Sequence, residues 1–526
     1  MGRFVNPGNI NFLKTIKEEI YVDKTELIAI INKAIGTKRV CFCNSRPRRF
    51  GKSTTAEMLT AYYSRGCSSL ELFQPYKIAK YPDFLDHLNK YDIICLDIQE
   101  MKWLAKGAEY TVEYLQQQVV AELRKLYPQI PLEPTALLSE ALSIINEETG
   151  ACFGIILDEW DCIIRDDQDK PQVIEEYIGF LRSLFKGLSQ SKLIAFAYLT
   201  GIFPIKKYNT QSALNNFLEY TMINPGPLAE YIGFTEAEVK ELCHKYSLDY
   251  KQLRRWYDGY YLGGQHIYNP CSVVNAMYEG IYQSYWSQTG TFETIQRLIN
   301  LDFTGLKEDV SHLLAGGSIN VNVRGFANDM STFINKDDVF TALIHLGYLT
   351  YDNINRRAFI PNEEIREEFA TAINNSSDWG QVHDLLQRSQ QLIKACWASD
   401  SSCVAQLIDQ FHQEYTSIIK YNDENSLASL LSIAYLGALE YYYRPVREMP
   451  AGKGYADLVF FPKREYPEVP AMVVELKWNK SAVSAVEQIK RRNYPAALSD
   501  YTGRVLLIGI NYDKASKAHE CNIELV

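Results

Sequence analysis

The sequence predicts an α/β fold whose first domain holds a parallel β-sheet covered by helices on both faces. Continuous apolar runs separated by helical segments predict buried parallel strands. The first four of these runs lie at residues 40–43, 93–97, 153–157 and 193–199. In open α/β sheets, ligands bind at the carboxyl ends of the strands. The polar residues that follow these strands are therefore the first candidates for a binding site.

The first strand leads into Arg46–Ser53, which reads RPRRFGKS, and then into a helical pattern at residues 54–63. Strand, tight loop, Gly-Lys-Ser and helix form the layout of a phosphate-binding loop. Main-chain N–H groups hold the anion, the lysine reaches the β- and γ-phosphates, and the serine ligates Mg²⁺. Arg46 replaces the first glycine of the motif and Pro47 removes a donor, so the loop needs partners elsewhere. The predicted ATP-binding residues of this loop are Arg49, Phe50, Gly51, Lys52, Ser53 and Thr54.

The third and fourth strands end in residues suited to nucleotide hydrolysis. Asp158 follows the third strand, where it can hold Mg²⁺ beside Ser53. Glu159 comes next and can polarise the attacking water, and Thr200 suits a sensor of the γ-phosphate or of that water. The alternative interpretation of Asp158 and Glu159 is a surface acid pair that ends a strand. The alternative for Thr200 is a strand-end turn. Asp97, after the second strand, is predicted to be structural.

The segments around this sheet are predicted to be mainly helical. The stretch Tyr21–Thr25 precedes a helix that packs on the core or forms a wall against the nucleotide base. A helix at residues 340–349, followed by an extended stretch to Asn362, suggests a helix with a β-wing. The predicted domains are residues 1–230 for the sheet domain with its helical lead-in, 231–398 for a helical lid or winged-helix-like spacer, and 399–526 for a C-terminal α/β domain.

The composition is that of an ordinary globular chain of about three domains, with 526 residues of which 47% are hydrophobic and 22% charged. No apolar run reaches the roughly 18 residues of a membrane span, and the N-terminus lacks the apolar core of a secretory signal. The 11 cysteines are scattered without a C-x-x-C pair, which favours free thiols and a cytoplasmic location. The net charge of −10 still allows a local basic patch to bind nucleic acid.

A second group of polar residues falls on two predicted strands in the last domain. Asp457 lies in the strand at 455–461, and Glu475 and Lys477 lie in the strand at 472–478. Residues i and i+2 of a strand share a face, and a hairpin can bring Asp457 alongside them. Two carboxylates can hold Mg²⁺, which activates water, and the lysine positions the nucleophile. Charges inside a buried strand cost stability unless they are paired or bind metal, although edge-strand charges are the alternative.

Two neighbouring helices add to this second candidate site. The helix predicted at residues 482–494 carries Gln488 and the basic run Lys490–Arg492, which suits a phosphate backbone. Glu440, on the helix predicted at 426–441, is a further candidate metal contact.

With both sites in place, the chain resembles a bacterial family that joins an N-terminal AAA-like ATPase domain to a C-terminal PD-(D/E)XK nuclease-superfamily domain. The resemblance covers nearly the whole chain and rests on Tyr21–Thr25, Arg46–Ser53, Leu157–Asp161, Leu199–Ile202, Trp256–Tyr260, Tyr268–Pro270, Leu346–Leu349, Ile360–Glu364, Gly454–Asp457 and Glu475–Lys477. It implies an AAA/STAND-like P-loop fold and a restriction-endonuclease-like fold. Arg46 matches the family's own loop, whereas Trp160 and Tyr455 depart from its commoner Tyr and Arg.

The motifs and the resemblance together predict an ATP-binding and ATP-hydrolysing protein coupled to a Mg²⁺-dependent nuclease that acts on DNA rather than RNA. The predicted catalytic residues are Glu159, Asp457, Glu475 and Lys477, and the predicted metal ligands are Ser53, Asp158, Asp457 and Glu475. An arginine finger supplied in trans would require a homo-oligomer. The alternative is a nucleotide-dependent signalling or assembly switch whose C-terminal domain only binds nucleic acid or a protein partner.

Overall fold

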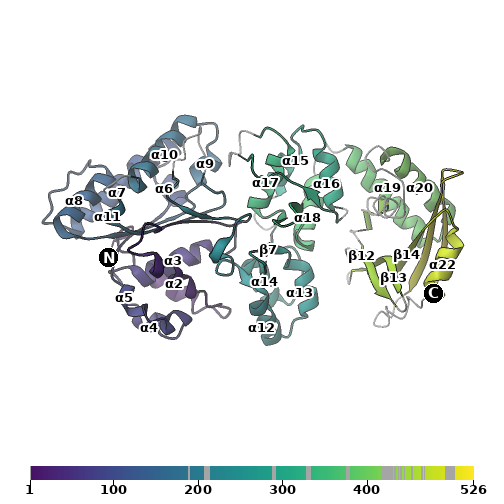
Figure 1. Ribbon diagram of the computed structural model, residues 1–526, viewed down its shortest axis with the longest axis horizontal. Coiled ribbons are helices and arrows are strands. Elements are labelled where there is room, and N and C mark those ends of the chain that lie inside the picture. Colours follow the sequence, from purple (N-terminus) through teal and green to yellow (C-terminus); the bar gives the residue numbers. More distant parts are fainter. Residues whose placement is uncertain are drawn as a thin grey trace. The chain divides into compact units, whose positions relative to one another are not determined.

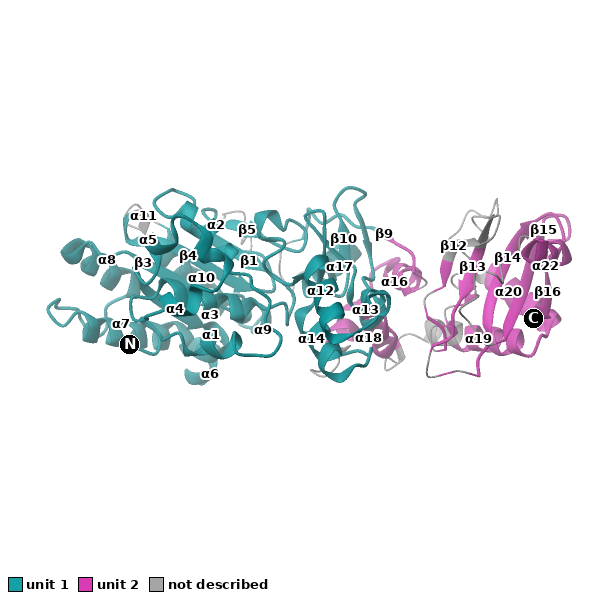
Figure 2. Cartoon of the chain, turned by 90° about the horizontal axis from the view of Figure 1, so that it is seen from below, with its two compact units in different colours: residues 1–288, 320–364 teal, residues 289–319, 365–526 magenta. Residues whose placement is uncertain are grey.

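The computed structural model describes residues 2–186, 190–205, 214–286, 292–314, 316–326, 333–374, 380–415, 431, 434–435, 437–438, 441–443, 445–451, 454–463, 466, 468–491 and 504–526. The chain divides into two compact units (Figure 2). The first unit contains residues 1–288 and 320–364, and the second contains residues 289–319 and 365–526. The predicted boundaries near residues 230 and 398 stay a prediction.

The first unit is built on a five-stranded sheet in the order β2-β3-β4-β1-β5. Its strands are β1 (Cys41–Ser45), β2 (Asp92–Asp97), β3 (Phe153–Asp158), β4 (Ile194–Gly201) and β5 (Leu218–Tyr220). Every pairing in this sheet is parallel, so the predicted parallel sheet is confirmed. Because β4 lies between β1 and β3, the loop after β1 and the acids after β3 come to the same edge of the sheet.

Helices cover both faces of this sheet, as Figure 1 shows. On one face, Cys43 and Leu157 pack in a hydrophobic core with Leu115 and Leu142 of the covering helices. On the other face, the ring of Phe196 lies 4.4 Å from that of Tyr63. The elements of this region are α1 (Ile10–Thr15), α2 (Glu26–Ala34), α3 (Lys52–Tyr63), α4 (Leu70–Phe73), η1 (Lys77–Lys80), α5 (Phe84–His87), α6 (Ile98–Leu104), η2 (Ala108–Tyr110), α7 (Thr111–Leu126), α8 (Leu138–Thr149), α9 (Cys162–Asp166), α10 (Pro171–Phe185) and α11 (Gln190–Leu193).

The rest of the first unit is mainly helical, with two small sheets. Thr235 caps the helix that follows it by forming a capping box with Glu238. A helix that begins at Lys336 is followed by an antiparallel strand pair, which agrees with the predicted helix and β-wing. The elements are η3 (Gly226–Leu228), β6 (Phe234–Thr235), α12 (Glu236–Tyr246), α13 (Tyr250–Tyr257), β7 (Tyr260–Leu262), β8 (Gln265–Tyr268), α14 (Pro270–Glu279), β9 (Ile319–Asn320), α17 (Lys336–Leu346), β10 (Thr350–Asp352) and β11 (Arg357–Phe359).

The second unit contains a five-stranded mixed sheet in the order β12-β13-β14-β15-β16. Its elements are α15 (Phe292–Ile299), α16 (Leu306–Leu314), α18 (Glu363–Asn374), α19 (Gly380–Trp397), α20 (Ser401–Tyr415), β12 (Val446–Ala451), β13 (Gly454–Phe460), β14 (Ala471–Trp478), α22 (Ala482–Arg491), β15 (Val505–Asp513) and β16 (Ala518–Leu525). Strands β14 and β15 are parallel and α22 connects them, whereas the other pairs are antiparallel. The edge strand β16 is absent from the sequence prediction, and most of the predicted helix at 426–441 lies outside the described residues.

Two further sequence predictions can be compared with the structure. In the part of the chain that the structure describes, no helix combines the length and the apolar character needed to cross a lipid bilayer. All 11 cysteines are free thiols, which confirms that part of the prediction.

Candidate functional site

The phosphate-binding loop joins β1 to α3 through two residues with left-handed backbone. Gly51 is the N-cap of α3 with φ of +88°, a conformation that glycine adopts without strain. Arg49 also has a positive φ, of 67°. The turn leaves Lys52 and Ser53 as the first residues of α3, where helix N–H groups lack intrahelical partners. The loop therefore has the free donors and the helix N-terminus that bind an anion.

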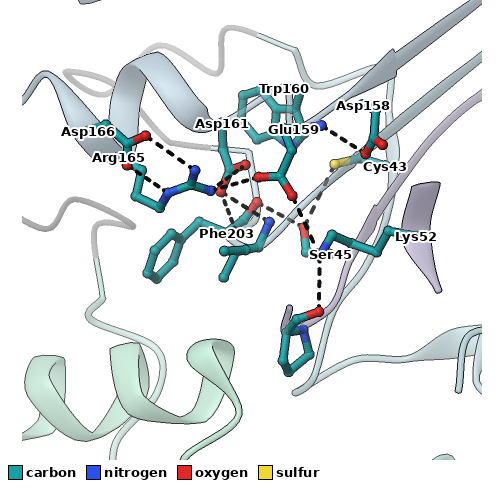
Figure 3. Close-up of polar contacts among 12 residues, drawn as sticks. Cys43, Ser45, Lys52, Asp158, Glu159, Trp160, Asp161, Arg165, Asp166 and Phe203 are labelled. Carbon is teal, nitrogen blue, oxygen red and sulfur yellow. Dashed lines mark hydrogen bonds and ion pairs between the residues drawn. The ribbon is translucent and has the colours of Figure 1, made fainter. Parts of the chain in front are cut away.

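The lysine of this loop is buried, with 5% of its side chain exposed. Its Nζ donates a hydrogen bond to the carbonyl oxygen of Pro47 at 3.0 Å and lies 3.8 Å from Oε1 of Glu159 (Figure 3). Burial lowers the pKa of Lys52, and the nearby carboxylates, with Glu159 first, oppose that shift. The ammonium group of Lys52 is thus held near the N-terminus of α3, in contact with the Pro47 carbonyl and the Glu159 carboxylate.

The arginines of the loop have different environments. Arg46 is fully buried, and its Nη1 donates to the carbonyl oxygen of Ser45 at 2.9 Å. Burial lowers the pKa of Arg46 to about 10. Arg49 instead lines a cavity and donates to the carbonyl oxygen of Tyr285 at 2.6 Å. The position that replaces the motif's first glycine therefore supports the main chain, whereas the cations that reach the cavity come later in the loop.

The acids after β3 lie beside the start of α3. Asp158, paired with Asp97 across the sheet, is buried. Burial raises the pKa of Asp158 to about 6, and a hydrogen bond from the Ser53 hydroxyl lowers it. A serine hydroxyl beside a buried carboxylate is an oxygen donor set that fits Mg²⁺. Asp97 caps α6 by accepting from the main-chain N–H of Glu100 at 3.0 Å, so its predicted structural role agrees with the structure.

The predicted sensor Thr200 lies near the end of β4 and is fully buried. Its hydroxyl has no hydrogen-bond partner among the described residues. Its carbonyl oxygen accepts from the main-chain N–H of Trp160 at 3.1 Å, which ties the end of β4 to the acids after β3. Thr200 and Asp158 are not among the described residues that line the cavity.

The cavity at this edge of the sheet has a volume of about 670 Å³, within the size range of small-molecule sites. The loop from Arg48 to Thr55 forms its polar wall together with Glu159 and Gln99. The remaining wall is largely apolar and contains Phe12, Ile20, Tyr21, Val22, Tyr231, Phe234, Pro270, Cys271 and Val274. A cavity lined by the cations of the loop and by apolar and aromatic side chains fits a nucleotide. Of the residues of this apolar wall, the sequence pointed only to the segment beginning at Tyr21.

An ion-pair network extends behind the acids (Figure 3). Arg165 of α9 lies 3.1 Å from Oε2 of Glu159 and 3.4 Å from Oδ1 of Asp161. The other oxygen of Asp161 accepts from the main-chain N–H groups of Ile202 and Phe203 at 3.1 and 2.8 Å. Sequence reasoning missed this network. The i,i+4 spacing of Asp161 and Arg165 is a signal that could have found part of it.

The predicted residues of the C-terminal site also come together. The carboxylate of Asp457 on β13 accepts from the main-chain N–H of Leu476 on β14 at 2.7 Å. Glu475 and Lys477 are buried on β14, with Lys477 Nζ 3.1 Å from Glu475 Oε1. Gln488 of α22 donates to the same oxygen of Glu475. The arrangement therefore holds two carboxylates and an ammonium on adjacent strands.

Carboxylate oxygens are the ligands that Mg²⁺ prefers, so Asp457 and Glu475 fit this ion chemically. Within the described residues, no group of three or more His, Cys, Asp and Glu side chains is arranged to hold a metal. The further candidate Glu440 lies outside the described residues. Glycine at position 509, next to Glu475 in the sheet, lets α22 approach, because a Cβ there would lie 2.2 Å from the carbonyl oxygen of Ala482.

Comparisons with known proteins match both regions. Residues 8–210 match the family model described as Predicted AAA-ATPase, and residues 422–521 match the PD-(D/E)XK nuclease superfamily. A curated relative, described as an uncharacterized protein in the vnfD 5' region of Azotobacter chroococcum mcd 1, is 26% identical over 283 residues. The match covers 52% of this chain and 51% of the relative, so the chain spans about half the length of that protein.

Among solved structures, the chain is similar to the Aeropyrum pernix ORC2 protein (ADPNP-ADP complexes). The likeness covers 68% of this chain and 96% of that chain, with 12% sequence identity and a TM-score of 0.29.

Proposed function

We propose that this chain, which joins a domain of the predicted AAA-ATPase family to a domain of the PD-(D/E)XK nuclease superfamily, hydrolyses ATP and cleaves DNA phosphodiesters. The observation that carries the ATP part is the cavity in which Lys52 and Glu159 line the same wall. Apolar side chains such as Tyr21 and Phe234 line another part of it, together with the polar Thr15, Glu18 and Lys24, and suit a nucleotide base.

In this proposal the phosphates of ATP replace the Pro47 carbonyl as the partner of Lys52. Loop N–H groups from Arg49 to Thr54 hold the remaining phosphate oxygens. Ser53 and Asp158 would hold Mg²⁺, whose positive charge would offset the charge of the phosphates. A water molecule attacks the γ-phosphorus, the bond to the bridging oxygen breaks, and Glu159 accepts the proton of the water. Thr200 is proposed to sense the γ-phosphate through the hydrogen bond that its carbonyl oxygen accepts from the main-chain N–H of Trp160, the residue after Glu159.

The nuclease part rests on the cluster of Asp457, Glu475 and Lys477 on adjacent strands. The two carboxylates would hold Mg²⁺, whose charge activates water and stabilises the phosphorane-like transition state. The buried ammonium of Lys477 orients the attacking water or the scissile phosphate. The exposed Arg491 at the end of α22 is suited to the DNA backbone.

The ATP part is tested by steady-state turnover of MgATP by the full chain and by Glu159→Gln. We expect at least a 100-fold loss of turnover in this variant, because general-base catalysis contributes roughly 10²–10⁴. Removal of the metal with EDTA is expected to abolish turnover. Unchanged turnover in the variant would show that Glu159 is not the base.

The nuclease part is tested by nicking of supercoiled plasmid in Mg²⁺ or Mn²⁺ with ATP. Asp457→Ala and Glu475→Gln are expected to abolish nicking, and Glu468→Gln, at an exposed loop position, is the matched control. If the wild-type chain leaves every form of DNA and RNA intact, the nuclease assignment is wrong.

A second candidate function is a nucleotide-dependent signalling or assembly switch. It is favoured by one observation: Oε1 of Glu475 is already bound by both Lys477 and Gln488. In that case the C-terminal domain binds nucleic acid or a protein partner without cleaving it. ATP turnover together with DNA binding and no nicking would identify this function. Sedimentation with and without ATP tests the homo-oligomer that an arginine finger in trans would require.

A further inference from the structure

Glu159 is held between two cations. Its Oε1 lies 3.8 Å from Nζ of Lys52, and its Oε2 lies 3.1 Å from Nη1 of Arg165 (Figure 3). Its backbone has φ of 48°, a left-handed conformation that is uncommon for residues other than glycine. The carboxylate lines the cavity with 18% of its side chain exposed. Its orientation therefore depends on these two cations more than on the rotamer preferences of a regular element.

Arg165 is itself held tightly. Its side chain is 8% exposed, and its Nε donates to Oδ1 of Asp166 at 2.9 Å. Burial disfavours the charged form, but the surrounding carboxylates, with Asp161 first, hold the pKa of Arg165 above its ordinary value. The guanidinium is thus a permanent cation that contacts the carboxylates of Glu159, Asp161 and Asp166. Its planar arrangement of several N–H donors allows these contacts at the same time.

Asp161, which contacts Arg165, is bound to the main chain just after β4. Asp161 is buried, and one of its oxygens accepts from Ile202 and Phe203 while the other contacts Arg165. These residues directly follow the segment that contains Thr200. Because the main chain after β4 fixes Asp161, Arg165 has a rigid support that does not depend on an occupied cavity.

We propose that Arg165 is a positioning residue for ATP hydrolysis, which keeps Glu159 in place when the phosphates of ATP recruit Lys52. This inference rests on the proposed ATPase function. Lys52 cannot serve the phosphates and Glu159 equally, so the contact of 3.8 Å weakens when nucleotide binds. Arg165 is not among the described residues that line the cavity, so a phosphate bound there does not draw it away from Glu159. It therefore remains the support of the carboxylate that receives the proton.

The first test compares wild type with Arg165→Gln in steady-state ATP turnover and in binding of a fluorescent ATP analogue. We expect kcat to fall about 10- to 100-fold, which is less than the roughly 10²–10⁴ for loss of the general base itself, because the carboxylate is retained but less well oriented. The dissociation constant is expected to change less than about threefold, since Arg165 acts through Glu159 and not on the nucleotide. Arg124→Gln, at an exposed position of α7, is the matched control and is expected to behave as wild type.

A double-variant cycle separates positioning from a purely structural role. In the Glu159→Gln background, Arg165→Gln is expected to cause no further loss in single-turnover hydrolysis, because its effect passes through the carboxylate. A structural role would instead lower turnover in both backgrounds and weaken nucleotide binding. Arg165→Lys keeps the charge without the fork, so it is expected to restore part of the lost kcat, and it replaces Arg165→Gln if the latter does not fold.

The outcomes distinguish this inference from the proposed function. If the wild-type chain does not hydrolyse ATP, or if Lys52→Ala leaves turnover unchanged, the proposed ATPase site is wrong. If the wild-type chain hydrolyses ATP but Arg165→Gln retains full kcat, only the positioning role is wrong. A multiplicative loss in the Glu159→Gln background would also overturn the positioning role.

Discussion

The ammonium group of Lys52 donates a hydrogen bond to the carbonyl oxygen of Pro47, five residues earlier in the same loop, at 3.0 Å. This hydrogen bond joins the start of the loop to the lysine at its end. A neutral carbonyl is a weaker partner for an ammonium group than an anion is, because only an anion adds the attraction between two full opposite charges. The contact therefore keeps the lysine in place and leaves its charge available to an incoming phosphate.

The first prediction concerns this lysine. Lys52→Ala is expected to weaken ATP binding about 10- to 100-fold, because a hydrogen bond to a charged group contributes roughly 1.5–3 kcal/mol. Titration with a fluorescent ATP analogue measures the loss. Lys33→Ala, at an exposed position of α2, should bind as wild type does. Equal affinities for Lys52→Ala and Lys33→Ala would place the phosphates elsewhere.

The second prediction concerns the apolar wall of the cavity. Tyr21 lines the cavity and packs edge-on against Phe12, with ring centroids 6.1 Å apart. Tyr21→Ala is expected to weaken ATP binding about tenfold, since contact between a base and an aromatic ring contributes roughly 1–3 kcal/mol. Binding of inorganic tripolyphosphate should not change, because it has no base.

Competition titrations of the fluorescent analogue with ATP and with tripolyphosphate measure both affinities. Tyr278→Ala, at an exposed position of α14, is the control. If Tyr21→Ala weakens ATP and tripolyphosphate equally, the base does not lie against this wall.

The third prediction compares a glycine with no room for a side chain, Gly509, with a glycine that has open space around it, Gly179. Gly509→Ala is expected to destabilise the protein by about 1–3 kcal/mol, because the new Cβ overlaps the main chain of Ala482. Displacement of α22 should also loosen the contact of Gln488 with Glu475 and reduce nicking. Gly179→Ala lies in α10 with open space around the new Cβ and is expected to stabilise by up to about 1 kcal/mol.

Thermal unfolding midpoints of the two glycine variants, with plasmid nicking as the second readout, check this difference. The prediction is contradicted if both variants shift the midpoint in the same direction by the same amount.

The fourth prediction concerns pH. His345 of α17 is buried, and burial lowers its pKa to about 3. Since the unfolded histidine has a pKa of about 6.5, the unfolded state binds a proton below that pH while the folded state does not. The neutral ring thus contributes stability above about pH 6.5 that is lost as the pH falls toward 3. Between pH 7 and pH 5 the expected loss is about 2 kcal/mol.

Urea unfolding of wild type and His345→Phe at both pH values measures this loss. Phenylalanine should be accepted at this site, because the imidazole already lies 5.9 Å from the ring of Phe326 and 6.2 Å from that of Phe203. The variant should lose about 2 kcal/mol less than wild type on acidification. An equal loss in both proteins would mean that His345 does not titrate in this way.

Local pattern was sufficient for the elements that bear both candidate sites. The runs of apolar residues predicted β1–β4 to within a few residues, because a strand buried on both faces must be continuously apolar. Strand β16 escaped prediction because most of its residues are only partly buried, so it has no such run. The sequence predicted only that Asp97 is structural, and the structure shows that it caps α6, because it directly precedes the first residue of that helix.

The sequence by itself determined the parallel sheet, the loop from Arg46 to Ser53, and the grouping of Asp457 with Glu475 and Lys477. The sheet follows from its continuous apolar runs, the loop from its motif, and the shared face of Glu475 and Lys477 from strand periodicity, with a hairpin bringing Asp457 alongside. Only the tertiary structure decided that Phe234 and Pro270 complete the cavity wall, and that Arg165 supports Glu159. Such contacts depend on how whole elements pack against each other, and packing is a property of many distant residues together.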